Sequence, residues 1–159
     1  TWTQADSAAL ERQADAWWDR IQAGGLGRAA RRTSWALQLV TAVILFQTLF
    51  FKFTGAAESK YIFSTLGIEP WGRYATGVAE LVAVILLLNP RTASAGGVMA
   101  MGLMAGALFS HFTRLGIEVQ GDDGLLFALA VTVFVLAAVV VALRRRELPV
   151  VGAVFQGSM

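Results

Sequence analysis

The sequence predicts an all-α integral membrane protein, a four-helix transmembrane bundle with an N-terminal amphipathic helix at the membrane interface. Hydrophobic residues make up 56% of the 159 residues and charged residues only 15%, whereas a soluble domain carries roughly 25% charged residues. Four apolar segments each approach the roughly 20 residues that a helix needs to cross a bilayer. A soluble bundle would instead need a polar face on every helix, and the last two segments have none.

The first 32 residues form a separate polar region, which we interpret as a cytoplasmic amphipathic helix followed by a linker. Its apolar residues recur at helical spacing and so share one face: Leu10, Trp17, Trp18 and Ile21. Gly24-Gly25 ends the pattern. Such a helix would lie on the membrane surface or dock on a partner subunit, and adjacent tryptophans suit both interpretations.

The predicted transmembrane segments cover residues 34–53, 71–88, 92–112 and 124–143. The fourth gives the clearest signal, because Thr132 is its only polar residue. The second is the least typical, because it contains Arg73 and Glu80. Pro70 precedes the second segment, where proline is tolerated in a first helical turn, and Asn89-Pro90 ends it.

The remaining segments connect or flank these helices. The loop after the first segment has room for a short helix at residues 56–66, which Gly67 would end. A Gly-Asp-Asp-Gly turn at residues 121–124 leads into the fourth segment. We therefore assign residues 33–146 to the membrane domain and residues 147–159 to a C-terminal tail.

The distribution of basic residues predicts the orientation, because cytoplasmic loops carry an excess of Lys and Arg. One side of the predicted bundle holds Arg28, Arg31, Arg32, Arg91, Arg144, Arg145 and Arg146. The other side holds Lys52, Lys60, Arg73 and Arg114, together with acidic loop residues. We therefore expect both termini in the cytoplasm.

A group of polar side chains is expected in the outer half of the bundle, where ionisable residues are costly and mark candidate sites. Lys52 ends the first segment and His111 ends the third. Glu80 lies seven residues beyond Arg73, and therefore about 10 Å deeper at 1.5 Å per residue. The whole candidate site comprises Lys52, Glu80, His111, Arg73, Arg114 and Gln47.

Helical periodicity places these residues on stripes that can face one another. The three stripes are Thr41, Leu45, Thr48 and Lys52; Arg73, Gly77, Glu80 and Val84; and Ala100, Met104, Ala107, His111 and Arg114. A buried Glu80 would accept hydrogen bonds from neighbouring cations or take up a proton. The cluster is then a structural ion pair, a ligand or proton site, or a contact with a partner subunit, and the sequence leaves all three open.

Small residues recur on the third segment at Gly102, Gly106 and Ser110. Such a stripe lets membrane helices approach closely. We expect it to serve helix packing inside the bundle, with homodimerisation as the alternative.

Several chemistries are excluded by composition. The chain has no cysteine and a single histidine, so it cannot form a disulfide, a cysteine-ligated zinc site or an iron–sulfur cluster by itself. Neither a P-loop nor a Ser/His/Asp arrangement nor convincing metal-ligand spacing occurs. We expect no metal, no nucleic-acid partner at a net charge of +2, and no catalytic activity of the chain alone.

Four motifs, taken in order, resemble the DoxX family of small bacterial membrane proteins. They are Lys52-Phe-Thr-Gly55; Phe63-Ser-Thr-Leu-Gly-Ile-Glu-Pro-Trp-Gly-Arg73; Gly77-Val-Ala-Glu80 with Leu86-Leu-Leu-Asn-Pro-Arg91; and Met104-Ala-Gly-Ala-Leu-Phe-Ser-His-Phe-Thr-Arg-Leu-Gly116. The likeness spans residues 37–146. It implies a four-helix bundle in the bacterial cytoplasmic (inner) membrane, with Lys52, Glu80 and His111 at recurrent polar positions of the family.

The resemblance also shapes the functional hypotheses, because members of the family are linked to quinone-dependent oxidoreductases and to other redox complexes of the membrane. The first hypothesis is an accessory subunit of a larger, redox-related, quinone-linked complex. The second is a stand-alone protein that binds quinone or another small ligand, or a lipid, at the polar cluster. The third is a small oligomeric transporter. Expected partners are membrane lipids and either other subunits or further copies of the chain.

Overall fold

The computed structural model describes residue 7, residues 10–14 and residues 27–144. The chain divides into two units, Thr1–Arg32 and Thr33–Met159. In the first unit, Leu10 belongs to a helical stretch at residues 10–14 and is exposed. The remaining residues of the expected amphipathic face and tail lie outside the described residues: Trp17, Trp18, Ile21 and 147–159.

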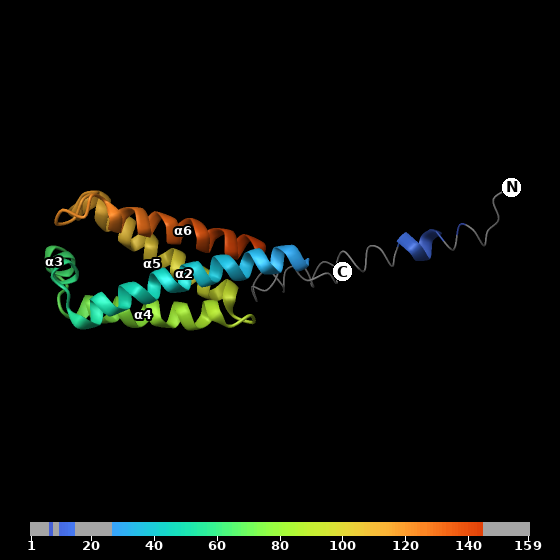
Figure 1. Ribbon diagram of the computed structural model, residues 1–159, viewed down its shortest axis with the longest axis horizontal. Coiled ribbons are helices and arrows are strands. Elements are labelled where there is room, and N and C mark those ends of the chain that lie inside the picture. The colour runs from blue at the N-terminus through green and yellow to red at the C-terminus, as the bar shows by residue number, and fades with distance from the viewer. Residues whose placement is uncertain (1–6, 8–9, 15–26, 145–159) are drawn as a thin grey trace. The chain divides into compact units, whose positions relative to one another are not determined.

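All regular structure formed by the described residues is helical (Figure 1). The elements are α2 (Arg28–Thr54), α3 (Ala57–Thr65), α4 (Trp71–Leu88), α5 (Ala93–Ser110), a π-helical turn η1 (His111–Leu115) and α6 (Leu125–Leu143). α2, α4, α5 and α6 coincide with the four apolar segments, and α3 with the short helix expected between the first two.

Two helix bounds differ from the sequence prediction. α2 begins at Arg28 rather than near residue 34, because a helix continues into a polar turn that apolar content does not reveal. The third long helix does not end at residue 112 but continues through η1 to Leu115. There the N–H of Gly116 donates to the carbonyl of His111 at 2.9 Å, which closes the wider π-helical turn.

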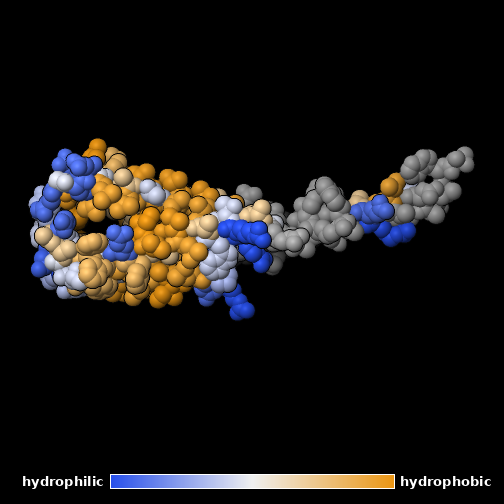
Figure 2. All heavy atoms as spheres, in the orientation of Figure 1, coloured by the Kyte–Doolittle hydropathy of each residue, from blue (hydrophilic) through white to orange (hydrophobic). Residues whose placement is uncertain are grey.

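The four long helices are long and apolar enough to cross a membrane, over Ala29–Thr54, Trp71–Leu88, Ala93–Leu115 and Leu125–Leu143. Large apolar side chains cover their outward faces, for example Phe50 at 67% exposure and Phe109 at 69%. Figure 2 shows this surface as a continuous apolar area over the helices. Water-soluble monomers rarely expose so large an apolar surface, so the helices are consistent with a multi-pass membrane protein.

The helices share one apolar core, which includes Leu45 of α2, Leu87 of α4, Ala100 of α5 and Ala137 of α6. α5 packs against both α4 and α6, and glycine permits this close approach. A Cβ at Gly96 would lie 2.5 Å from the backbone nitrogen of Leu87. The small residues of α5 therefore bring its first half against its neighbours.

The helices separate toward the end of the unit that carries α3. In Figure 1, α5 and α6 diverge there from α2 and α4, and α3 lies between the two pairs. Figure 2 shows the surface hollowed beside α3 on the face drawn. The last turn of α2 and the first turn of α4 lie at this end, so their polar residues border the separated part of the helices.

Candidate functional site

A buried ion pair joins α2 to α4. The Lys52 ammonium contacts both carboxylate oxygens of Glu80, at 2.9 and 3.0 Å. The Thr48 hydroxyl lies 2.8 Å from Oε2, the Glu80 oxygen that is 2.9 Å from the ammonium. The Glu80 side chain is 5% exposed and that of Lys52 is 16% exposed, so the cation is the member of the pair that reaches the surface.

The stripes of α2 and α4 face each other and so bring Lys52 and Glu80 together. Thr48 and Lys52 follow one another by one turn on the inner face of α2, where Leu45 is also buried. On α4, Gly77 and Glu80 are buried on the facing stripe. A Cβ at Gly77 would lie 3.2 Å from the ring of Phe53. The missing side chain therefore lets α2 approach α4 at the level where Lys52 reaches across.

Arg73 supports the pair from the first turn of α4. Its guanidinium binds the Glu69 carboxylate, with Nη2 at 2.8 Å and Nε at 2.9 Å from Oε1. Nη1 donates to the carbonyl of Lys52, and the guanidinium stacks 4.4 Å from the Tyr74 ring centroid. A cation on a carbonyl of the last turn complements the negative end of a helix. Arg73 thus holds the end of α2 against α4 and orients Lys52 without contacting Glu80.

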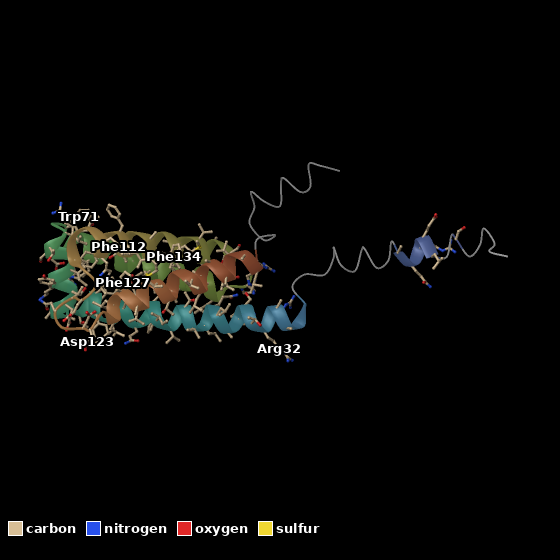
Figure 3. All side chains as sticks on the ribbon, turned by 90° about the horizontal axis from the view of Figure 1, so that it is seen from above. Arg32, Trp71, Phe112, Asp123, Phe127 and Phe134 are labelled. Atoms are coloured by element: carbon tan, nitrogen blue, oxygen red, sulfur yellow. The ribbon has the colours of Figure 1, made fainter. Side chains whose placement is uncertain are left out.

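His111 is buried at the start of η1 but belongs to a different set of contacts. Its Nδ1 lies 2.7 Å from the carbonyl of Gly116, and a carbonyl can only accept, so Nδ1 carries the proton. The ring packs edge-to-face on Phe127 at 5.5 Å, and Phe112 also packs edge-to-face on Phe127, at 5.6 Å. Figure 3 shows Phe112 and Phe127 at the end of the unit where Trp71 and Asp123 also lie.

Two further candidates lie at the surface. Gln47 on α2 and Arg114 in η1 are both exposed. The structure therefore brings Lys52, Glu80 and Arg73 together, with Thr48 and Glu69 as their partners, and it leaves Gln47, Arg114 and His111 outside that group. Thr48 shares the stripe of Lys52, whereas Glu69 lies in the turn before α4, four residues before Arg73.

The expected packing stripe of α5 lies on an open face. A Cβ at Gly102 or Gly106 would meet no atom within 4 Å, and the Ser110 hydroxyl donates to the carbonyl of Gly106. Among the described residues, no neighbouring helix covers Gly102 or Gly106. The close approach uses Gly96 and Gly97 instead, one to two turns earlier, because α5 crosses its neighbours there.

A second buried polar group lies where α6 ends, and sequence reasoning missed it. Arg144, there counted as a loop charge, is buried and donates to the Ser34 hydroxyl at 2.8 Å and to the carbonyl of Pro90 at 2.9 Å. Gln38 lies 2.6 Å from the same hydroxyl. The sequence contains one indication of this group, because Ser34 lies seven residues before Thr41 on the polar stripe of α2.

Asp122 organises the turn that leads into α6. Its carboxylate accepts hydrogen bonds from the backbone N–H groups of Val119, Gly124 and Leu126, at 2.7 to 3.0 Å. Burial raises the pKa of Asp122, but these three bonds and the nearby His111 outweigh it and hold the pKa below its usual value. The carboxylate thus caps the N-terminal end of α6.

The arrangement suits hydrogen bonding to a small molecule better than metal binding. Within the described residues, no group of three His, Cys, Asp or Glu could hold a metal ion. An ammonium offers three donors and a carboxylate only acceptors. A ligand carbonyl or hydroxyl that reaches Lys52 would find a donor whose charge Glu80 already balances.

Comparison of the chain with protein-family models, with curated proteins and with solved structures finds no match.

Proposed function

We propose that this chain is a DoxX-like protein of the bacterial cytoplasmic membrane, a four-helix bundle with both termini in the cytoplasm, and that it binds the polar head of a membrane-soluble ligand beside Lys52 and Glu80. Four apolar helices support the membrane assignment. The order of motifs from Lys52 to Gly116 supports the family. The resemblance favours a quinone as the ligand, because relatives are linked to quinone chemistry.

The unequal burial of the ion pair carries the proposal. A purely structural ion pair offsets the cost of desolvation only when the hydrogen-bonding groups of both members are satisfied inside the protein. Here Glu80 is held by Thr48 and Lys52, whereas the Lys52 side chain remains 16% exposed. Lys52 can therefore donate to a quinone carbonyl while Glu80 stays bound to Thr48.

The test measures quinone binding by the full chain in lipid nanodiscs. Calorimetric titration with a short-chain quinone should give saturable binding. Lys52→Met and Glu80→Gln should each weaken it about tenfold or more, because each removes a charge-assisted hydrogen bond or the charge that orients it.

Glu58→Gln is the matched control, because Glu58 is an exposed carboxylate in the first turn of α3 at the same end of the unit. It should leave the affinity unchanged. Equal affinities for all four proteins, with folding intact, would refute the proposed site.

A second candidate function, an accessory subunit of a redox-related membrane complex, is favoured by the open face at Gly102 and Gly106. Small residues on a lipid-facing surface allow another helix to approach closely. Native mass spectrometry from a mild detergent should then detect a heteromeric complex, which Gly102→Leu should dissociate. A monomer under every mild condition would count against this function.

A further inference from the structure

One stripe on the inner face of α2 is polar along most of its length. Its residues Ser34, Gln38, Thr41, Leu45, Thr48 and Lys52 recur at helical spacing and lie within an arc of roughly 80° at 3.6 residues per turn. Only Leu45 is apolar. The opposite faces of the same helix carry exposed apolar residues such as Val43 and Phe50. This stripe is thus more polar than the exposed faces of α2, although Ala42 and Leu49 beside it are also buried.

Two atoms of this polar face are buried without a hydrogen-bond partner, Gln38 Oε1 and Thr41 Oγ1. Both side chains are 0% exposed. Exchanging the oxygen and nitrogen of the Gln38 amide would let it accept from Ser34, but the exchange would then leave the amide N–H groups unpaired. Either assignment therefore leaves Gln38 and Thr41 with unused hydrogen-bonding capacity.

Thr41 differs in this respect from other helical threonines of the chain. The hydroxyls of Thr76 and Thr132 each lie within 2.8 to 3.1 Å of a backbone carbonyl three or four residues earlier. Such local bonds satisfy a hydroxyl without any ligand. The Thr41 hydroxyl makes no such bond, and no other group of the protein satisfies it.

A hydroxyl without a hydrogen-bond partner is costly at the position of Thr41 in a membrane. It lies near the middle of the apolar span Ala29–Thr54, where lipid supplies no hydrogen bonds. Buried polar groups in proteins are bonded to protein or to ordered water with few exceptions. Gln38 and Thr41 are three residues apart and so are neighbours on one helical face.

We propose that Gln38 and Thr41 bind ordered water inside the helix core, in the half of the protein remote from the Lys52–Glu80 pair. A buried water makes about three hydrogen bonds, and the hydroxyl of Thr41 with the amide of Gln38 supplies donors and acceptors for it. Through Ser34 the site continues to Arg144 at the end of α6. Leu45 separates it from Thr48, so this water site is independent of any ligand at Lys52.

Water-edited solid-state NMR of the full chain in bilayers tests the proposal directly. Magnetisation should pass from water to the Gln38 side-chain amide and to Thr41 several-fold faster than to Ala100 and Ala137, which are equally buried but apolar. Transfer to Gln38 as slow as transfer to those alanines would overturn the proposal.

Substitution of Thr41 gives a second measurement. Thr41→Val should slow the transfer to Gln38 and lower the Tm, because the water loses a partner, whereas Thr41→Ser should retain both properties. Thr132→Val is the control, because its hydroxyl is already bonded within α6, and it should leave the transfer at Gln38 unchanged. A higher Tm for Thr41→Val would show an unsatisfied hydroxyl and no bound water, and would refute the site.

Discussion

At the scale of single residues, the charges inside the helices are placed in sets with complementary partners. Glu80 accepts from Thr48 and Lys52, and Arg73 donates to Glu69 and to a carbonyl of α2. Pairing offsets the cost of taking a charge out of water, but a pair that loses one member leaves the other uncompensated. Glu80 is the less exposed member of its pair, so losing Lys52 should lower the stability of the protein more than losing Glu80.

Lys52→Met should thus destabilise the protein by about 3–5 kcal/mol, because it leaves the Glu80 carboxylate buried without a cation. Glu80→Gln should cost less, since Lys52 is long enough to extend its ammonium toward water. Thermal unfolding of the purified variants in one detergent measures both. The reverse order of stabilities would show that Lys52, not Glu80, is the trapped charge.

Asp122→Asn should lower stability by about 1 kcal/mol at neutral pH, because the amide cannot replace every hydrogen bond of the helix-capping carboxylate. The pKa of Asp122 is lowered in the folded protein. Its stabilisation is therefore complete above the ordinary aspartate pKa and is lost as the pH falls through the lower, folded value. Unfolding curves of the two proteins should converge in acid.

Asp123→Asn is the control for this comparison. Asp123 is exposed in the same turn, with φ 51°, a conformation that asparagine also adopts readily. The variant removes the same charge and should unfold like the parent at every pH. A matching loss in both variants would assign the effect to net charge and not to the cap.

At the scale of elements, α5 uses its glycines in two ways. Gly96 faces the backbone of α4, and Gly97 faces Val141 of α6, whose side chain would lie 2.8 Å from an added Cβ. Gly102 and Gly106 face open space. One helix therefore combines a tight internal contact with an uncovered outer stripe, and composition alone does not distinguish them.

Gly96→Ala should destabilise the protein by about 1–3 kcal/mol, because the added methyl overlaps backbone atoms that cannot rotate away. Gly102→Ala should be neutral or stabilising by up to about 1 kcal/mol, because alanine favours helix and meets no neighbour. Thermal unfolding of the two variants measures both changes in stability. Equal destabilisation would mean that another chain covers Gly102 under the conditions of the measurement.

At the scale of the whole molecule, the proposed orientation rests on basic residues that do not all lie in loops. Arg73 and Arg144 are buried and hydrogen-bonded. Arg144 lies on the predicted cytoplasmic side and Arg73 on the predicted outer side. Leaving both out of the comparison therefore does not change the excess of arginine on the side of Arg91. The helices between these ends are long and apolar enough for four crossings.

The absence of native cysteine allows a direct test of orientation. In intact cells, Glu58→Cys in α3 and Asp123→Cys in the turn before α6 should react with a membrane-impermeant thiol reagent. Arg91→Cys, between α4 and α5, should react only after lysis. Labelling of Arg91→Cys alone in intact cells would invert the proposed topology.

Part of the candidate site could be predicted because depth along a helix follows from residue number. The positions of Lys52 and Glu80 in the apolar segments placed them at one end, and helical spacing placed them on inner stripes. The sequence did not reveal that Arg73 binds Glu69, that His111 closes onto Gly116, or that Ser34 and Arg144 form a second polar group. Those pairings depend on the rotation of each helix and on loop conformation.

The sequence by itself determined the number of long helices and most of their bounds, because apolar length and breaker residues are local properties that a membrane span requires. Only the tertiary structure decided which polar groups meet, which glycines are covered and where unused hydrogen-bonding capacity remains. Gln38 and Thr41 illustrate the difference. Their place on the inner face of α2 follows from periodicity, but whether a neighbouring helix satisfies them depends on how four helices pack together.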